Sequence, residues 1–156
     1  LSQGLRFFHQ GQFEARRKRI SPHLVRAPVE APDDALRAFY DELLGVLQRQ
    51  TVRDGQWQLL ECTPGWRGNW TSECFVVFAW QDSSQDRLLV AVNYATNQSQ
   101  CHVRLPFSDL KGHTIRFKDL MSSAAYEHKG DDLQSHGLYL DMPGWGYHVF
   151  QVSIVA

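Results

Sequence analysis

The sequence predicts a mainly β protein: an antiparallel β-sandwich of about seven to eight strands with an N-terminal α-helical appendage. Two observations lead to this prediction. Apolar residues follow a helical period over residues 33–50, and the period changes to two after Asp54-Gly55. Turn-forming residues then separate short alternating runs at intervals typical of hairpins. These patterns indicate one helix followed by an all-β domain of about 100 residues.

The helix is predicted over residues 33–50. Its apolar residues recur three and four positions apart and form one stripe: Leu36, Phe39, Tyr40, Leu43, Leu44 and Leu47. Pro32 precedes Asp33 and Asp34, which suit the cap and first turn of a helix because their oxygens accept hydrogen bonds from the free amides there. We therefore expect this helix to bury its stripe against a sheet of the β domain.

Seven runs with a period of two are predicted to be strands: residues 57–61, 74–80, 87–94, 100–105, 114–119, 137–141 and 147–154. Turn-forming pairs such as Pro143-Gly144 separate them. In the last run alternate residues face opposite sides, and we expect the side that carries Phe150 to be the core. Trp57 and Trp80 lie within predicted strands and are expected to be packing residues.

Composition and charge exclude several classes of protein. The 156 residues are 43% hydrophobic and 21% charged, which suits a globular domain with its own core. The net charge of −1 gives no overall basic footprint, and the local run Arg16-Arg17-Lys18-Arg19 is expected to be a solvated face. No apolar stretch approaches the ~18 residues of a membrane span. We therefore expect the chain to bind neither nucleic acid nor membrane.

The cysteines and the chain start bear on location. Cys62, Cys74 and Cys101 cannot all pair, and two of them lie in or beside strand-like runs, where free cysteine packs as a small hydrophobe. A reduced compartment, and so a cytoplasmic location, is expected; the alternative is an exported protein with one disulfide. The start at Leu1, without an initiator Met or a signal-peptide pattern, leads us to expect a chain internal to a longer protein.

The sequence offers no catalytic site, metal site or cofactor motif. The seven histidines show none of the spacings of zinc ligands, and the glycine motifs that bind phosphates or dinucleotides are absent. A glycosidase would need two carboxylates ~5–10 Å apart across one bond. The acidic residues Glu14, Glu61, Asp119 and Asp141 show no such pairing, and we expect the last two to accept hydrogen bonds from turn amides.

One loop stands out as a candidate binding site. Residues 64–70 (PGWRGNW) place two tryptophans four positions apart, with an arginine and an asparagine between them. Indole rings can stack on the apolar faces of sugars, and Arg and Asn side chains can bond hydroxyls. We predict a carbohydrate-binding site formed by Trp66, Arg67, Asn69 and Trp70. The alternative is that the rings close the edge of the sandwich or a domain contact, as we expect of the turn residue Trp145.

Several segments resemble, in order along the chain, the closing part of α-amylase-family glycoside hydrolases. Residues 4–12 (GLRFFHQGQ) are similar to the segment around the last strand of the catalytic barrel, and residues 36–40 (LRAFY) to its last helix. Four later segments resemble strands and turns of the C-terminal sandwich of these enzymes: 88–94 (LLVAVNY), 117–121 (FKDLM), 137–141 (GLYLD) and 146–150 (GYHVF). Each motif is moderately specific alone, and their order is the stronger sign.

The resemblance implies a domain organisation and a function. Residues 1–52 would be the tail of the catalytic barrel, with a remnant of its last strand at residues 5–8, and residues 53–156 the C-terminal β-sandwich domain. The catalytic carboxylates of such enzymes follow barrel strands four, five and seven, which have no counterpart here. The resemblance therefore implies a non-catalytic fragment of a glycosidase acting on α-glucans, whose partner is the catalytic barrel that it stabilises. Without that barrel, residues 1–32 are expected to be mobile or to dock irregularly on the sandwich.

Two other functions stay open at this point. A carbohydrate-binding module would hold α-glucan through the Trp66/Trp70 loop. A protein-interaction sandwich would use the apolar surface that faces the barrel in the first interpretation, and it would self-associate through that surface.

Overall fold

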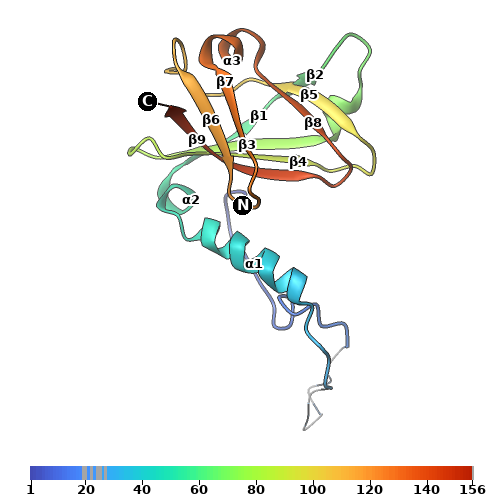
Figure 1. Ribbon diagram of the computed structural model, residues 1–156. Coiled ribbons are helices and arrows are strands. Elements are labelled where there is room, and N and C mark those ends of the chain that lie inside the picture. The colour runs from blue at the N-terminus through green and yellow to red at the C-terminus, as the bar shows by residue number, and fades with distance from the viewer. Residues whose placement is uncertain (19–20, 22, 24–25, 27, 156) are drawn as a thin grey trace.

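The computed structural model describes residues 1–18, 21, 23, 26 and 28–155. Over these residues nine strands form two antiparallel sheets, so the predicted mainly β fold with an N-terminal helical part is confirmed. Figure 1 shows the small sheet above the central strands of the large sheet, and the longest helix below them. All seven predicted strands are present, and two short strands were not predicted.

The large sheet has six strands in the order β1-β3-β4-β9-β6-β7, and the small sheet has three in the order β2-β5-β8. The bounds of the large sheet's strands are β1 (Gln56–Leu60), β3 (Phe75–Gln81), β4 (Arg87–Asn93), β6 (Thr114–Asp119), β7 (Ala125–Lys129) and β9 (Tyr147–Val155). Those of the small sheet are β2 (Cys62–Pro64), β5 (Ser99–Val103) and β8 (Leu138–Met142). The last strand, β9, lies between β4 and β6 and so joins the two halves of the large sheet.

The sandwich core lies between the two sheets because alternate residues of each strand turn inward. Val77 of β3, Leu140 of β8 and Phe150 of β9 belong to this core, as predicted for the Phe150 side of the last strand. The other side of β9 is buried as well, since Val149 belongs to a second apolar cluster.

The second cluster covers the outer face of the large sheet. Phe78, Val90 and Val149 form a buried row across β3, β4 and β9. The helix α1 (Asp34–Leu47) packs on this face through one side of its predicted stripe, including Phe39 and Leu43. Two predicted packing residues are confirmed in the same cluster: Trp57 and Trp80. The large sheet is therefore apolar on both faces near its centre.

The helix predicted over residues 33–50 is divided into two. It begins as expected, because Asp33 caps α1 and its Oδ1 accepts a hydrogen bond from the Leu36 N–H at 3.0 Å. It ends at Leu47, and the extended backbone of Arg49 starts a second helix, α2 (Gln50–Asp54). The Arg49 Nη2 lies 2.8 Å from Asp86 Oδ1, so the break directs this side chain to the loop between β3 and β4. The prediction of one continuous helix was wrong at this point.

Two strands and a helix are among the further elements that were not predicted from the sequence. The strand β2 has three residues and ends in Pro64, and β7 exposes every residue, so neither shows alternation. The helix α3 (Gly130–His136) replaces a predicted turn. A Cβ on Gly130 would lie 1.7 Å from the Leu110 carbonyl oxygen, and Leu133 is buried in the core. The glycine that indicated a turn instead allows a helix to start in close contact with its neighbour.

Residues 1–18 are turns and irregular backbone, so the strand expected at residues 5–8 was wrong. No neighbouring strand pairs with the amides of these residues, and an isolated segment without a pairing strand has nothing to hold it extended. The segment docks irregularly on α1, where the rings of Phe8 and Phe13 pack on Tyr40 with centroids 6.3 and 4.8 Å from it. It also reaches the sheet, since Trp80 Nε1 donates a hydrogen bond to the Leu1 carbonyl oxygen at 2.9 Å.

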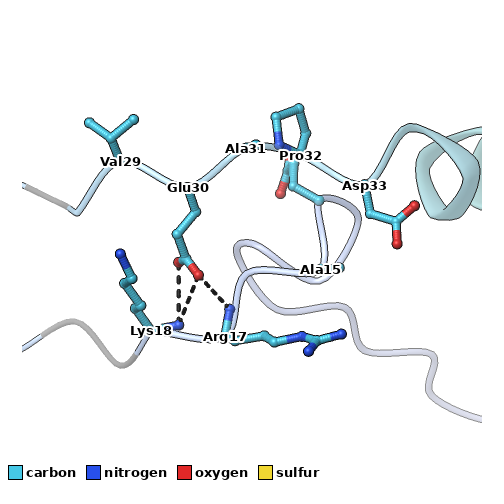
Figure 2. A pocket seen from close by; sticks show the side chains of 9 residues that line it. Ala15, Arg17, Lys18, Val29, Glu30, Ala31, Pro32 and Asp33 are labelled. Carbon is cyan, nitrogen blue, oxygen red and sulfur yellow. Dashed lines mark hydrogen bonds between the residues drawn. The ribbon is translucent and has the colours of Figure 1, made fainter.

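Residues 14–18 run beside residues 29–33 (Figure 2). The carboxylate of Glu30 accepts hydrogen bonds from the backbone N–H groups of Arg17 at 3.1 Å and Lys18 at 3.3 Å. Both basic side chains belong to exposed residues, and Arg19 of the same run lies outside the described residues. Glu30 therefore connects residues 17–18 to residues 29–33, and these two stretches border an open hollow of about 550 Å³.

Candidate functional site

The loop of residues 65–70 leaves β2 of the small sheet and leads through a short 3₁₀ helix, η1 (Thr71–Cys74), to β3 of the large sheet. Gly68 has φ +89°, in the left-handed region that glycine adopts without strain. One residue later, the Asn69 N–H donates to the Trp66 carbonyl oxygen at 3.1 Å. At the end of the loop, Thr71 Oγ1 accepts a hydrogen bond from the Gln100 N–H at 2.9 Å. The loop is thus attached to β5 as well as to β2.

Three of the four predicted site residues are exposed on this loop. Trp66 is 55% exposed and Trp70 is 65% exposed, and Arg67 between them is exposed too. Neither indole is buried in the edge of the sandwich. Both are therefore accessible to a ligand.

Asn69 differs from the exposed three, because its side chain is buried and bonded within the loop. It is 7% exposed, and its Oδ1 accepts hydrogen bonds from the Thr71 N–H at 2.9 Å and from Thr71 Oγ1 at 2.8 Å. Its Nδ2 donates to Gln100 Oε1 at 3.4 Å. The side chain is used to turn the backbone into η1. An Asn that bonds the backbone two residues on is a common turn signal, and it was available in the sequence.

A group of side chains beside the loop was missed by sequence reasoning. Alternation in β5 and β8 places Gln100, His102, Tyr139 and Asp141 on the outer face of the small sheet. Tyr139 is 45% exposed, and its ring centroid lies 5.1 Å from that of His102. Asp141 Oδ1 accepts hydrogen bonds from Gln98 Nε2 at 2.5 Å and from Gln100 Nε2 at 3.0 Å. Only the register of β5 with β8 brings these residues together, and neither strand shows it alone.

The buried carboxylate of Asp119 joins the end of β6 to the start of β9. Its Oδ1 accepts hydrogen bonds from the N–H groups of Met121 and Val149, both at 3.1 Å. Its Oδ2 accepts from Ser122 Oγ at 2.7 Å and lies 2.9 Å from His148 Nδ1, which must donate to a carboxylate. The prediction that Asp119 binds turn amides is confirmed by Met121, and Val149 adds an amide from β9. The same prediction for Asp141 was wrong in its partners, which are the side-chain amides of Gln98 and Gln100.

These hydrogen bonds set the charge of Asp119. Burial raises the pKa of the carboxyl, but the hydrogen bonds from His148, Ser122 and the two amides outweigh it and hold the pKa below the ordinary value of 3.8. Ser122 donates to Asp119 and not to His148, so the three side chains lack the order of a nucleophile, a base and an orienting acid. The arrangement is structural.

Two of the three free cysteines lie on neighbouring strands, Cys62 on β2 and Cys101 on β5. Their thiols share a hydrogen bond, which together with burial raises the pKa of Cys101. A thiol with a raised pKa and no exposed surface is a poor nucleophile. Cys101 is therefore a core residue.

Neither a metal site nor a match to other proteins indicates what this site binds. Across the described residues, no three His, Cys, Asp or Glu side chains gather as metal ligands would. Among the same described residues, no helix is long and apolar enough to cross a membrane. Comparisons with protein-family models and with curated proteins give no match to the sequence.

Proposed function

We propose that this chain is the closing part of an α-amylase-family glycoside hydrolase, with residues 1–52 from the end of the catalytic barrel and residues 53–156 as the C-terminal sandwich. By itself it is non-catalytic. Its partner is the catalytic barrel of the parent enzyme, which acts on α-glucans and which it stabilises. The ordered resemblance of its segments to that family supports this proposal. We also place the protein in the cytoplasm, which its free cysteines support.

The apolar outer face of the large sheet carries the proposal. In a free-standing antiparallel sandwich the outward side chains are mainly polar, because water covers them. Here a second cross-strand row, Val76–Val92–Tyr147, continues the apolar face, and Val76 and Tyr147 are each 43% exposed. This row and Phe39 of α1 line a groove of about 360 Å³. A barrel lying against the sheet would cover this groove.

The direction of α1 supports the same proposal. Its N-terminal half projects away from the sandwich, with the irregular segment beside it (Figure 1). There Tyr40 contacts short pieces of that segment, such as Gln12, whose Nε2 donates to the Tyr40 hydroxyl at 2.7 Å. Leu5 and Phe7 are 96% and 78% exposed. In a (β/α)₈ barrel, the outer helices bury such stripes against the strands.

The first test is a turnover assay with starch and maltooligosaccharides. We expect no hydrolysis by the isolated chain, because Asp119 binds backbone amides, Glu127 pairs with Arg116 and Asp141 binds glutamine amides, so no two of these strand carboxylates are paired with each other. Activity that survives repurification would contradict the proposal.

The second test compares Val76→Asp in the isolated chain and in the full-length enzyme. In the isolated chain Val76 is 43% exposed, so a carboxylate there can stay hydrated and should cost under about 1 kcal/mol. Under a barrel the same carboxylate would be buried without a partner, and the melting temperature of the enzyme should fall by several degrees. Ile154→Asp is the matched control, because Ile154 is 39% exposed at the far end of β9. Equal effects of Val76→Asp in both proteins would contradict barrel docking.

The same groove could instead join two copies of the chain. Sedimentation at rising protein concentration separates this function from barrel docking. A dimer that Val76→Asp dissolves would favour a protein-interaction sandwich, whereas a concentration-independent monomer would leave barrel docking as the use of the groove.

A second candidate function is carbohydrate binding through the loop, which the exposure of Trp66 and Trp70 favours. Starch embedded in a native gel should retard the protein, and Trp66→Ala/Trp70→Ala should abolish the retardation because both stacking rings are lost. Trp145→Ala is the control, since Trp145 is 57% exposed in a different turn. Unretarded migration of the native chain would contradict this function.

A further inference from the structure

We infer that the outer face of the small sheet extends the Trp66–Trp70 loop into one binding site for a chain of neutral sugar units. The inference rests on the carbohydrate-binding function proposed above and adds residues that the loop does not contain. Tyr139 supplies a stacking ring, and Asp141 with Gln98 and Gln100 binds hydroxyls.

The loop and the sheet face form one continuous surface. A Cβ built on Gly65 would lie 3.3 Å from Tyr139 Cε2 and 3.6 Å from Gln100 Cβ. The backbone at the start of the loop therefore rests directly against Tyr139, and only a glycine fits there without moving the ring. Trp66 follows Gly65 directly in the chain and is 55% exposed, and Tyr139 is 45% exposed.

The Tyr139 ring is held in place while one side stays accessible. The His102 ring contacts it at a centroid distance of 5.1 Å with an interplanar angle of 52°. Gly65 borders it from the loop. A ring that is fixed before a ligand arrives loses little rotamer freedom on binding, which favours stacking on a sugar.

The polar group beside this ring has unused hydrogen-bonding capacity. Asp141 follows Tyr139 by two residues on the same face of β8, about 7 Å along the strand. Its Oδ1 is taken by the amide groups of Gln98 and Gln100. Among the described residues, no donor reaches its Oδ2. The free carboxylate oxygen can accept a hydrogen bond from one hydroxyl of a sugar unit, and the NH₂ groups of the two glutamines can donate to neighbouring hydroxyls.

Charge and polarity favour a neutral sugar over other occupants. The residues assigned to the site include one carboxylate, that of Asp141, and one guanidinium, that of Arg67, so their charges cancel. A polyanion would meet too little positive charge. An apolar peptide would leave the carboxylate and amides of the sheet face desolvated without partners.

The test is a titration of the ¹⁵N-labelled chain with maltoheptaose, followed by amide and indole NMR shifts. We expect shifts in β5 and β8 as well as at the indoles of the loop. Tyr139→Ala should weaken binding about fivefold, the effect of losing one stacked ring, whereas Tyr139→Phe should bind as the native chain does. Asp141→Asn should weaken binding by a similar factor, because a charge-assisted acceptor becomes a neutral one. Trp145→Ala is the control and should leave the affinity unchanged.

The outcomes separate this inference from the functions on which it builds. Shifts confined to Trp66 and Trp70, with Tyr139→Ala binding normally, would overturn the sheet-face site and leave the loop proposal standing. No shift at millimolar maltoheptaose would overturn both. Neither result bears on the proposed docking of the barrel, which the Val76→Asp comparison tests separately. Unchanged thermal unfolding of Tyr139→Ala shows that a loss of affinity is not a loss of fold.

Discussion

Replacing Asp119 with alanine is expected to lower the free energy of unfolding by about 4 kcal/mol. The carboxylate is 3% exposed and accepts hydrogen bonds from the buried amides of Met121 and Val149. Without it both N–H groups are buried and unpaired, at a cost of ~1–3 kcal/mol each. The perturbation matters for function because Met121 lines the apolar groove proposed to face the barrel.

Asp119→Asn is the matched variant. One oxygen of the native carboxylate accepts from both amides, and the oxygen of an Asn side chain can do the same. The Asn amide would then face Ser122 and His148, which can accept a hydrogen bond as well as donate one. We therefore expect a loss of only about 1–2 kcal/mol, the difference between charged and neutral hydrogen bonds.

The pH dependence gives an independent readout. Because folding lowers the pKa of Asp119, the carboxylate contributes stability above its unfolded pKa of about 3.8. That contribution is lost as the pH falls through the still lower pKa of the folded state. The stability of the native chain should therefore fall below about pH 4, and the fall should be shallower in Asp119→Asn, which does not titrate.

Urea denaturation followed by tryptophan fluorescence measures these differences directly. Thermal melts should agree, with the midpoint of Asp119→Ala about 8–16 °C below that of the native chain. A loss of less than 1 kcal/mol in Asp119→Ala would refute the reasoning, because it would mean that the two amides find other partners. Equal losses in the Ala and Asn variants would refute the role given to the shared oxygen.

Three further predictions concern the packing of the sandwich. In urea denaturation, Asp86→Ala should lower the free energy of unfolding by about 2 kcal/mol, because this carboxylate bonds both α2 and β9. The control Glu127→Ala removes an exposed ion pair and should lower it by less than about 1 kcal/mol. Gly130→Ala should cost more than about 3 kcal/mol because its Cβ meets a carbonyl oxygen at 1.7 Å, whereas Gly45→Ala in α1, with open space around it, should stabilise the chain slightly; thermal melts would distinguish them. A thiol reagent should modify Cys101 only after unfolding, and rapid labelling under native conditions, located by mass spectrometry, would contradict its burial.

Periodicity was sufficient for the fold wherever a strand has two different sides or a helix has one apolar stripe. The run that contains Phe150 alternates strongly, and its position and core side were predictable. The same pattern did not show that Val149, on the other side, is buried too, because the partner there is a helix more than 90 residues earlier in the chain. The strand β7 was missed since all its residues are exposed and nothing in it alternates.

The candidate site was predictable only in part, for a related reason. The tryptophans of the loop are unusual enough to be found by residue type. In the sequence Asn69 looks as suitable for binding as Arg67, but its side-chain oxygen is used in the hydrogen bonds that form the turn. Tyr139 and Asp141 come together with Gln100 through strand pairing, which the individual strands do not show.

The central place of β9 has a consequence for how the protein is made. Its residues pair on one side with β4 and on the other with β6, and it is the last of the nine strands to leave the ribosome. Until then the nascent chain holds β1-β3-β4 and β6-β7 as separate pieces, each with an open edge able to pair with other chains. A truncated protein that ends before Tyr147 would lack the strand that joins those pieces, so chaperones and proteases should bind it.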